Sequence, residues 1–114
     1  MKFKEFNDIK FYYGENAQDN WNLLDLSVNI NPNYIWFHLD NFPSCYVIMY
    51  EELENLEENQ KTFFLNFGAN LCKQKSKYRN FNNLKIIYTK LNKLKKTENT
   101  GEVIVSGQKN TITI

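Results

Sequence analysis

Glycine, proline and cysteine are scarce in this sequence. Of its 114 residues, four are Gly, two are Pro and two are Cys. So few Gly and Pro leave no flexible linker, and the length suits one hydrophobic core, so we expect a single domain, residues 1–114. The two cysteines, Cys45 and Cys72, are too few for a disulfide scaffold. Neither has a second Cys or His beside it, which argues against zinc, and both lie in apolar segments typical of free core thiols.

Long apolar runs and known catalytic motifs are also missing. No run approaches the roughly 20 residues needed to cross a bilayer, and the first 14 residues lack the apolar centre of a secretory signal. We therefore expect a cytoplasmic protein with no membrane partner. There is no Gly-rich phosphate loop, G-x-S-x-G motif or His–Glu zinc motif, and the acidic run Glu51–Glu58 matches no calcium loop. The residues predict no cofactor, no metal and no obligate small molecule, and nothing in them favours an enzyme.

Histidine occurs once, as His38, directly after Trp36 and Phe37 in an apolar segment. In a strand, alternation places Trp36 and His38 on the same face. A general base needs hydrogen-bonded partners, and none occurs at a useful spacing. We therefore expect His38 to be a hydrogen-bonded structural residue.

Several aromatic residues offer flat faces on which nucleobases could stack. The candidates are Tyr12, Tyr13, Trp21, Trp36 and Phe42. Aromatic side chains on strands more often belong to the core, so Phe42, which lies in a predicted loop, is the better candidate.

Charge is distributed unevenly along the chain. Residues 1–59 contain 3 basic and 11 acidic residues, a net charge of −8, whereas residues 60–114 contain 11 basic and 2 acidic residues, a net charge of +9. This asymmetry favours a nucleic-acid partner for the basic half. The alternative is that the two halves pair with each other inside the fold.

The cations of the basic half gather in two runs. One follows the predicted second helix, and the other occupies residues 90–97, which we expect to form a loop. Lysine supplies mobile point charges that bind phosphate without fixed geometry, although a solvated loop with no partner is the alternative for residues 90–97. The residues predicted to bind RNA are Lys73, Lys75, Lys77, Arg79, Lys90, Lys93, Lys95 and Lys96.

Hydrophobic patterning predicts six strands and two helices. Short β-prone segments lie at residues 9–13, 34–39, 45–50, 84–89, 101–105 and 111–114. The segments 34–39 and 45–50 are expected to pair as a hairpin. The segments 101–105 and 111–114 are expected to be joined by the polar turn 106–110. One helix is predicted to be capped by Asn16, with Ala17, Trp21, Leu24 and Val28 on its apolar face.

The second helix is predicted from about residue 59 to 76, with Phe63, Phe67 and Leu71 on its apolar face. Hairpin-forming strands outnumber the helices. The pattern therefore predicts an α+β fold, a largely antiparallel sheet with two principal helices.

Five segments, in the same order along the chain, resemble those of one family. Each is given with the pattern that it resembles: 14–20 (G-K-N/D…N-[DE]), 34–38 (D-I-W-F-H), 44–47 (small-small-His-Val), 87–97 (V-Y-T…N-L-K-K-T) and 101–109 (G-Q-I…Q-K). The family is that of NFACT-R domains, in the short standalone form typified by coiled-coil domain-containing protein 25. The resemblance extends from about residue 9 to residue 114.

Three residues depart from the family's pattern. Glu15 replaces its Lys, Tyr34 replaces the Asp before Ile-Trp, and Tyr46 replaces its second His. The polar cluster beside the hairpin is therefore partly erased, which weakens any catalytic role implied by the resemblance.

NFACT-R domains occur in ribosome quality-control factors, which sit on the large subunit and contact tRNA. The resemblance therefore implies the ribosome as partner, through rRNA and ribosomal proteins, in competition with tRNA. Because the sequence holds no NFACT-N domain and no coiled coil, we expect a non-enzymatic factor that occupies a tRNA site, with the exit site favoured. Such a factor would hold ribosomes dormant, as do microsporidian dormancy factors of similar size and composition.

Two alternatives remain open. One is a nucleic-acid-binding adaptor, which the coiled-coil relative suggests for DNA. The other is an RNA-processing enzyme that uses His38 and nearby hydroxyl groups.

Overall fold

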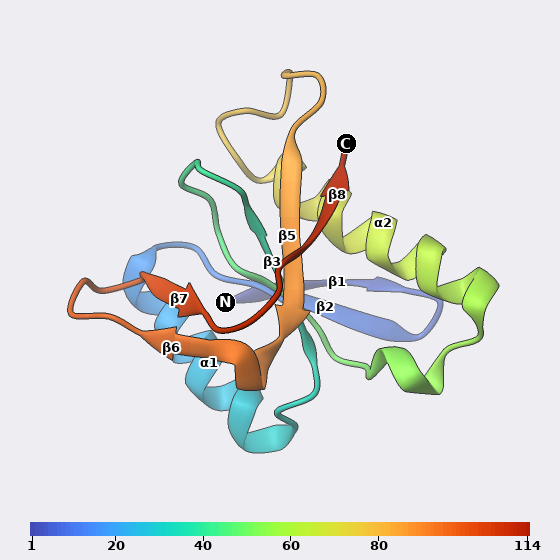
Figure 1. Cartoon of the computed structure of the whole chain (residues 1–114), viewed down its shortest axis with the longest axis horizontal. Helices are drawn as coiled ribbons and strands as arrows, with labels where there is room; N and C mark the ends of the chain where they lie inside the picture. Colours follow the sequence, from blue (N-terminus) through green and yellow to red (C-terminus); the bar gives the residue numbers. More distant parts are fainter.

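A six-stranded sheet forms the centre of the computed structural model, which describes all residues from 1 to 114 (Figure 1). Every neighbouring pair of strands runs antiparallel. In spatial order the strands are β1 (Lys2–Phe6), β2 (Ile9–Tyr13), β4 (Val47–Met49), β3 (Ile35–Leu39), β5 (Lys85–Lys90) and β8 (Asn110–Thr113). The remaining strands, β6 (Leu94–Lys96) and β7 (Val103–Val105), pair in a small second sheet.

Two helices complete the architecture, α1 (Ala17–Ile30) and α2 (Glu58–Gln74), with short 3₁₀ turns at η1 (Leu53–Asn55) and η2 (Leu91–Lys93). In Figure 1, α2 lies to the right of the central strands, whereas α1 and the β6–β7 ribbon lie together on the left. Neither helix is long and apolar enough to cross a bilayer. The predicted α+β fold with a largely antiparallel sheet and two principal helices is confirmed.

The large sheet is buried on both faces. Phe37 and Val47 belong to the core that includes α2, whereas Trp36 and Ile48, their neighbours in sequence, belong to the core that includes α1. Side chains alternate between the faces of a strand. Residues 35–39 therefore read as a continuous apolar run, because both faces are covered.

Helix α1 begins where its sequence predicts. The Asn16 side chain accepts a hydrogen bond from the backbone N–H of Asp19 at 2.8 Å, so the predicted cap is confirmed. The predicted apolar face is only partly correct: Leu24 is buried, Trp21 and Val28 are half-buried, and Ala17 is exposed. The fully buried face instead consists of Asn20, Leu23, Leu24 and Ser27.

The predicted apolar face of α2 is wrong at its first position. Phe63 is 67% exposed, and the buried face consists of Phe64, Gly68, Ala69, Leu71 and Cys72. The rings that α2 packs against the sheet are Phe64 and Phe67. Phe6 of β1, an extra strand that the sequence pattern did not reveal, stacks on Phe67 with ring centroids 4.6 Å apart and lies 5.4 Å from the ring of Phe64.

Three segments pair differently from the prediction. Residues 2–6 form β1, a strand that the sequence pattern did not predict. Residues 94–96 form β6 rather than a loop, because Leu94 packs against the α1-side core. Strands β7 and β8 are not a hairpin: β7 pairs with β6, and β8 pairs with β5. The turn at 106–110 therefore carries the chain from one sheet to the other.

Gly68 allows α2 to approach β3 closely. A methyl group at this position would lie 2.5 Å from Cε1 of Phe37, well inside van der Waals contact. We predict that Gly68→Ala lowers the free energy of unfolding by about 1 kcal/mol, because overpacking outweighs the gain in helix propensity. Chemical denaturation checks this, with Asn66→Ala on the exposed face of the same helix as the control. A Gly68→Ala variant as stable as the wild type would contradict the close contact.

Candidate functional site

The first basic run follows the end of α2 and carries no ion pair. The Lys75 ammonium lies 4.9 Å above the ring of Tyr13, and the Lys73 ammonium donates to the carbonyl of Ile114 at 3.4 Å. Lys77 and Arg79 are exposed, and neither has an acidic partner within 4 Å. The four cations of this run, which we call the 73–79 segment, are therefore available to an anion from outside the chain.

The second basic run is divided between paired and unpaired cations. Lys90 forms an ion pair with Glu54 at 2.5 Å, and its ammonium holds the pKa of Glu54 below the ordinary value. Lys96 pairs with Asp25 at 2.7 Å and lies 4.8 Å above the ring of Trp21. Lys93 and Lys95 are exposed and have no ion-pair partner. Of the cations in the two basic runs, only Lys90 and Lys96 thus pair with the acidic half of the sequence, which is the alternative considered above.

Two adjoining cavities, of about 740 Å³ and 710 Å³, lie on either side of His38. We call them together the His38 hollow. Both are lined by the β3–β4 loop at Pro43 and by the β6–β7 turn at Thr100 and Gly101. The larger cavity also meets the start of α1 and the 73–79 segment at Lys75 and Lys77. Elements far apart in the sequence therefore converge on one concave region.

Tyr46 and Asn20 fix the walls of the hollow. The side-chain amide oxygen of the buried Asn20 accepts a hydrogen bond from the Tyr46 backbone N–H at 3.1 Å, and the Gly14 N–H donates to the Tyr46 carbonyl at 3.2 Å. The Tyr46 hydroxyl donates to the carbonyl of Gly101 at 2.5 Å. Burial raises the pKa of Tyr46 to about 12, so the hydroxyl keeps its proton at neutral pH. One residue thus joins β4 to the start of α1 and to the β6–β7 turn.

His38 is hydrogen-bonded, as predicted, but it also faces both cavities. Its Nδ1 lies 2.7 Å from the Leu39 carbonyl, and its ring stacks on Trp36 with centroids 5.4 Å apart. A carbonyl can only accept a hydrogen bond, so Nδ1 carries the proton of the neutral ring and Nε2 is left as an acceptor. Burial lowers the pKa of His38, outweighing the nearby Leu39 and Ser44 carbonyls and Asp40. The ring is therefore neutral at pH 7.

The two cysteines are free thiols, as the sequence predicts. Cys72 is buried and Cys45 is half-buried, and burial raises the pKa of Cys72 to about 12 and that of Cys45 to about 11. Both are protonated thiols at neutral pH rather than reactive thiolates. No group of three or more His, Cys, Asp or Glu side chains is close enough to hold a metal ion.

Three aromatic rings form a row beside the hollow. Phe42 and Tyr78 have ring centroids 4.6 Å apart, and Tyr78 and Phe81 lie at 5.3 Å. Phe42 and Phe81 are both exposed. Of the stacking candidates from the sequence, Phe42 alone is exposed, and Trp36 and Tyr13 are buried. Tyr78 and Phe81 were missed, although their position within and after the 73–79 segment was a signal that could have found them.

These features define a small α+β domain with unpaired cations beside a hollow and an aromatic row. The family model of the NFACT protein RNA binding domain matches residues 1–111, and the chain belongs to this family. The resemblance found in the sequence segments is thereby confirmed, and the family is one of RNA-binding domains.

A solved structure shares the fold. The C-terminal part of the fibronectin/fibrinogen-binding protein from Streptococcus suis matches with a TM-score of 0.73 at 23% sequence identity. The match covers 93% of this chain and 40% of that one, so this chain spans less than half of the larger structure. A search of curated proteins gives no significant match.

His38 gives the stability of the fold a pH dependence. Its pKa is lowered in the folded chain, so the unfolded chain takes up a proton first as the pH falls through the ordinary value of about 6.5. We predict that the free energy of unfolding falls between about pH 7.5 and pH 5.5, and that His38→Asn, which keeps an N–H near the Leu39 carbonyl, flattens this fall. Denaturant titrations at several pH values measure it. Parallel curves for the two proteins would contradict the assignment.

The Tyr46 hydroxyl holds the β6–β7 turn against the hollow. We predict that Tyr46→Phe lowers the free energy of unfolding by about 1 kcal/mol, the usual contribution of one hydrogen bond. Amide exchange in residues 97–102 should accelerate more than exchange in β3. Tyr88→Phe is the matched control, because that hydroxyl makes no hydrogen bond within the chain. Equal exchange in the wild type and Tyr46→Phe would show that other contacts hold the turn.

Proposed function

We propose that this protein is a non-enzymatic RNA-binding factor of the cytoplasm that binds ribosomes through its unpaired cations. It occupies a tRNA site, with the exit site favoured, in competition with tRNA, and keeps the ribosome dormant. The observation that carries the proposal is the set of exposed cations without acidic partners in a domain of an RNA-binding family. The primary phosphate-binding residues are Lys75, Lys77, Arg79, Lys93 and Lys95, with Lys73 beside them.

The fold keeps the cations of the 73–79 segment away from the acidic run. Glu51–Glu58 ends at the first turn of α2, and the 73–79 segment begins at its last turn. A helix of 17 residues is about 25 Å long. Physiological salt screens charges over about 8 Å, so these two blocks of opposite charge do not neutralise each other. The separation supports a surface with one cationic end for RNA and one acidic end for solvent or basic ribosomal proteins.

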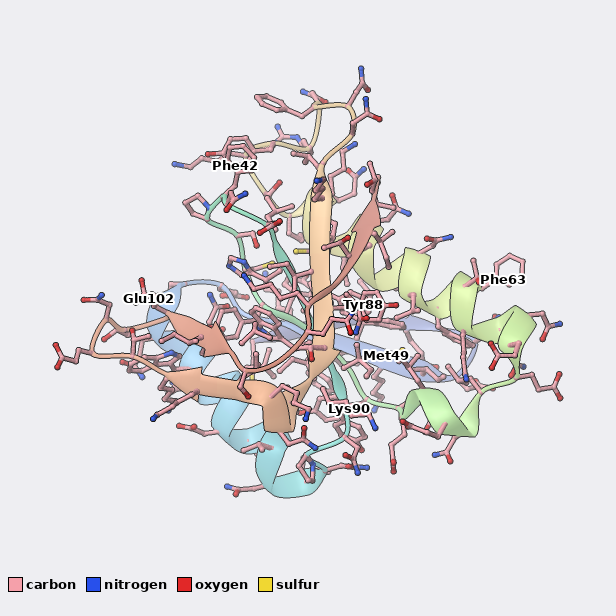
Figure 2. All side chains as sticks on the ribbon, viewed as in Figure 1. Phe42, Met49, Phe63, Tyr88, Lys90 and Glu102 are labelled. Carbon is pink, nitrogen blue, oxygen red and sulfur yellow. The ribbon has the colours of Figure 1, made fainter.

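We expect Lys90 and Lys96 to contribute less to phosphate binding than the unpaired cations. Each would have to leave its carboxylate partner, Glu54 or Asp25, before it could bind a phosphate. Both pairs are partly exposed, and such pairs are weak enough to exchange partners. Lys90 lies near the bottom of the molecule in Figure 2, away from the loop that carries Phe42.

Salt dependence tests the phosphate contacts. Each contact contributes about 0.7–0.9 to the slope of log affinity against log salt, so five contacts give a slope of roughly −3.5 to −4.5. We predict that the triple variant Lys75→Ala/Lys77→Ala/Arg79→Ala flattens the slope by about 2 units and releases the protein from ribosomes at moderate salt. Cosedimentation with ribosomes across a salt series measures both effects.

A matched triple variant controls for net charge. Lys4→Ala/Lys61→Ala/Lys85→Ala removes the same charge from positions outside both basic runs and should leave the slope unchanged. Equal slopes for the two triple variants would show that net charge, not the 73–79 segment, drives binding. Tighter binding to free DNA than to ribosomes would favour the adaptor instead.

A further inference from the structure

The two cavities of the His38 hollow differ in charge. The larger one is lined by Lys2, Lys75 and Lys77 against a single carboxylate, Glu15, which itself pairs with Lys2 at 3.5 Å. The smaller one is lined by Asp40 and Glu102 against a single cation, Lys109. One side of His38 therefore suits an anion, and the other side suits a neutral group that donates hydrogen bonds.

The smaller cavity also has apolar walls. Trp36, Phe42 and Ile104 are among the hydrophobic residues that line it. Figure 2 shows Phe42 and Glu102 on the same side of the molecule, at the β3–β4 loop and the β6–β7 turn, with Phe63 far away on the opposite side. Apolar side chains and carboxylates line the same cavity, and this combination suits a flat ring with polar edges.

His38 presents an acceptor where the two cavities meet. Its Nδ1 proton is committed to the Leu39 carbonyl, which leaves Nε2 of the neutral ring as an acceptor. The acceptors at the smaller cavity are Nε2 of His38 and the carboxylate of Asp40, which makes no hydrogen bond within the chain. The Oε1 atom of Glu102 already accepts from Thr97 and Asn99, and the donors that line the cavity are Asn41, Thr100 and Lys109. The volumes of about 740 Å³ and 710 Å³ lie in the range of ligand-binding cavities.

We propose that the His38 hollow binds an unpaired RNA nucleotide whose base carries an exocyclic amino group. Its phosphate lies in the larger cavity on Lys75 and Lys77, and its base lies in the smaller cavity beside His38. This inference rests on the proposed RNA binding and adds the class of nucleotide. The next base along the strand stacks on the row formed by Phe42, Tyr78 and Phe81, since exposed aromatic rings stack on bases of any sequence.

The hydrogen-bond acceptors of the smaller cavity favour cytosine over uracil. Cytosine donates from its N4 amino group, whereas uracil carries a carbonyl oxygen at the same position. Beside Asp40 and His38 that oxygen would face a carboxylate and the Nε2 lone pair, so uracil leaves these two groups unpaired or in repulsion. Cytosine and uracil have the same ring size, so the comparison isolates the amino group. A paired nucleotide cannot enter, because its amino group is already bonded to the opposite strand.

The test compares octamers of cytidylate (rC8) and uridylate (rU8) by fluorescence anisotropy at one low salt concentration. The wild type should bind rC8 at least about fivefold more tightly than rU8 and more tightly than an RNA duplex of the same length. Thr100→Trp fills the rim shared by both cavities without changing charge, and it should abolish the difference between rC8 and rU8. Gln108→Trp, on an exposed turn outside the hollow, should keep the difference.

Asp40→Asn gives a second variant that does not depend on the folding of Thr100→Trp. It replaces an acceptor-only group by an amide of the same shape, so it should reduce the preference for rC8 severalfold. Equal binding of rC8 and rU8 by the wild type, or a preference unchanged in Thr100→Trp and Asp40→Asn, would overturn the inference. If both octamers bind equally with a steep salt slope, RNA binding stands and the nucleotide preference fails. If neither octamer binds and ribosomes do not retain the protein, the proposed function fails as well.

Free nucleotides distinguish the source of the ligand. CMP and UMP carry the same base and phosphate as the octamers but no neighbouring residues. CMP should compete with rC8 only at concentrations at least about tenfold higher than rC8 itself, because it lacks the adjacent phosphates and the second stacked base. CMP that competes as well as rC8 would overturn RNA as the source.

Discussion

Tyr46 is the residue on which the geometry of the surface depends. Its backbone N–H and carbonyl bind Asn20 and Gly14, its hydroxyl binds the Gly101 carbonyl, and its ring meets His38 edge-on at 5.8 Å. A side chain on Gly14 would collide with Asn20, so the absence of a Cβ there is part of the same arrangement. Four segments far apart in sequence are held by one residue: the end of β2, the first turn of α1, β3 and the β6–β7 turn. The hollow exists because these segments are fixed at a constant separation.

The sequence predicted what depends on local patterns and missed what depends on long-range pairing. The cap at Asn16 and the strand predicted at 34–39, which the structure has at 35–39, are local features, and both were predicted. Strand β1 was missed because Phe6 is its one half-buried residue, and its burial comes from Phe67, 61 positions away. The predicted hairpin of β7 and β8 was wrong for a similar reason, because β8 instead pairs with β5, which precedes β6 and β7 in the chain.

The candidate site was predicted in composition but not in shape. The sequence predicted eight cations from their spacing. In the structure they differ in whether a carboxylate of the acidic half lies close enough to form an ion pair. Asp25 on α1 reaches β6, and Glu54 in η1 reaches the end of β5, so Lys96 and Lys90 are paired. No carboxylate comes within 4 Å of the ammonium groups of Lys75 and Lys77. This distinction depends on the path of α2 and α1 through space, which no spacing of lysines along the sequence can report.

The three departures from the family pattern lie in different places, and their positions favour binding over proton transfer. Tyr34 stacks on Tyr50 at 4.5 Å, and it lines neither cavity of the hollow. Glu15 pairs with Lys2 at the rim, and Tyr46 holds the β6–β7 turn through a hydroxyl that keeps its proton. Burial lowers the pKa of His38, and its Nδ1 faces a carbonyl rather than a carboxylate that would strengthen it as a base. A neutral ring with a fixed acceptor, set between lysines on one side and carboxylates on the other, is suited to holding a nucleotide in one orientation.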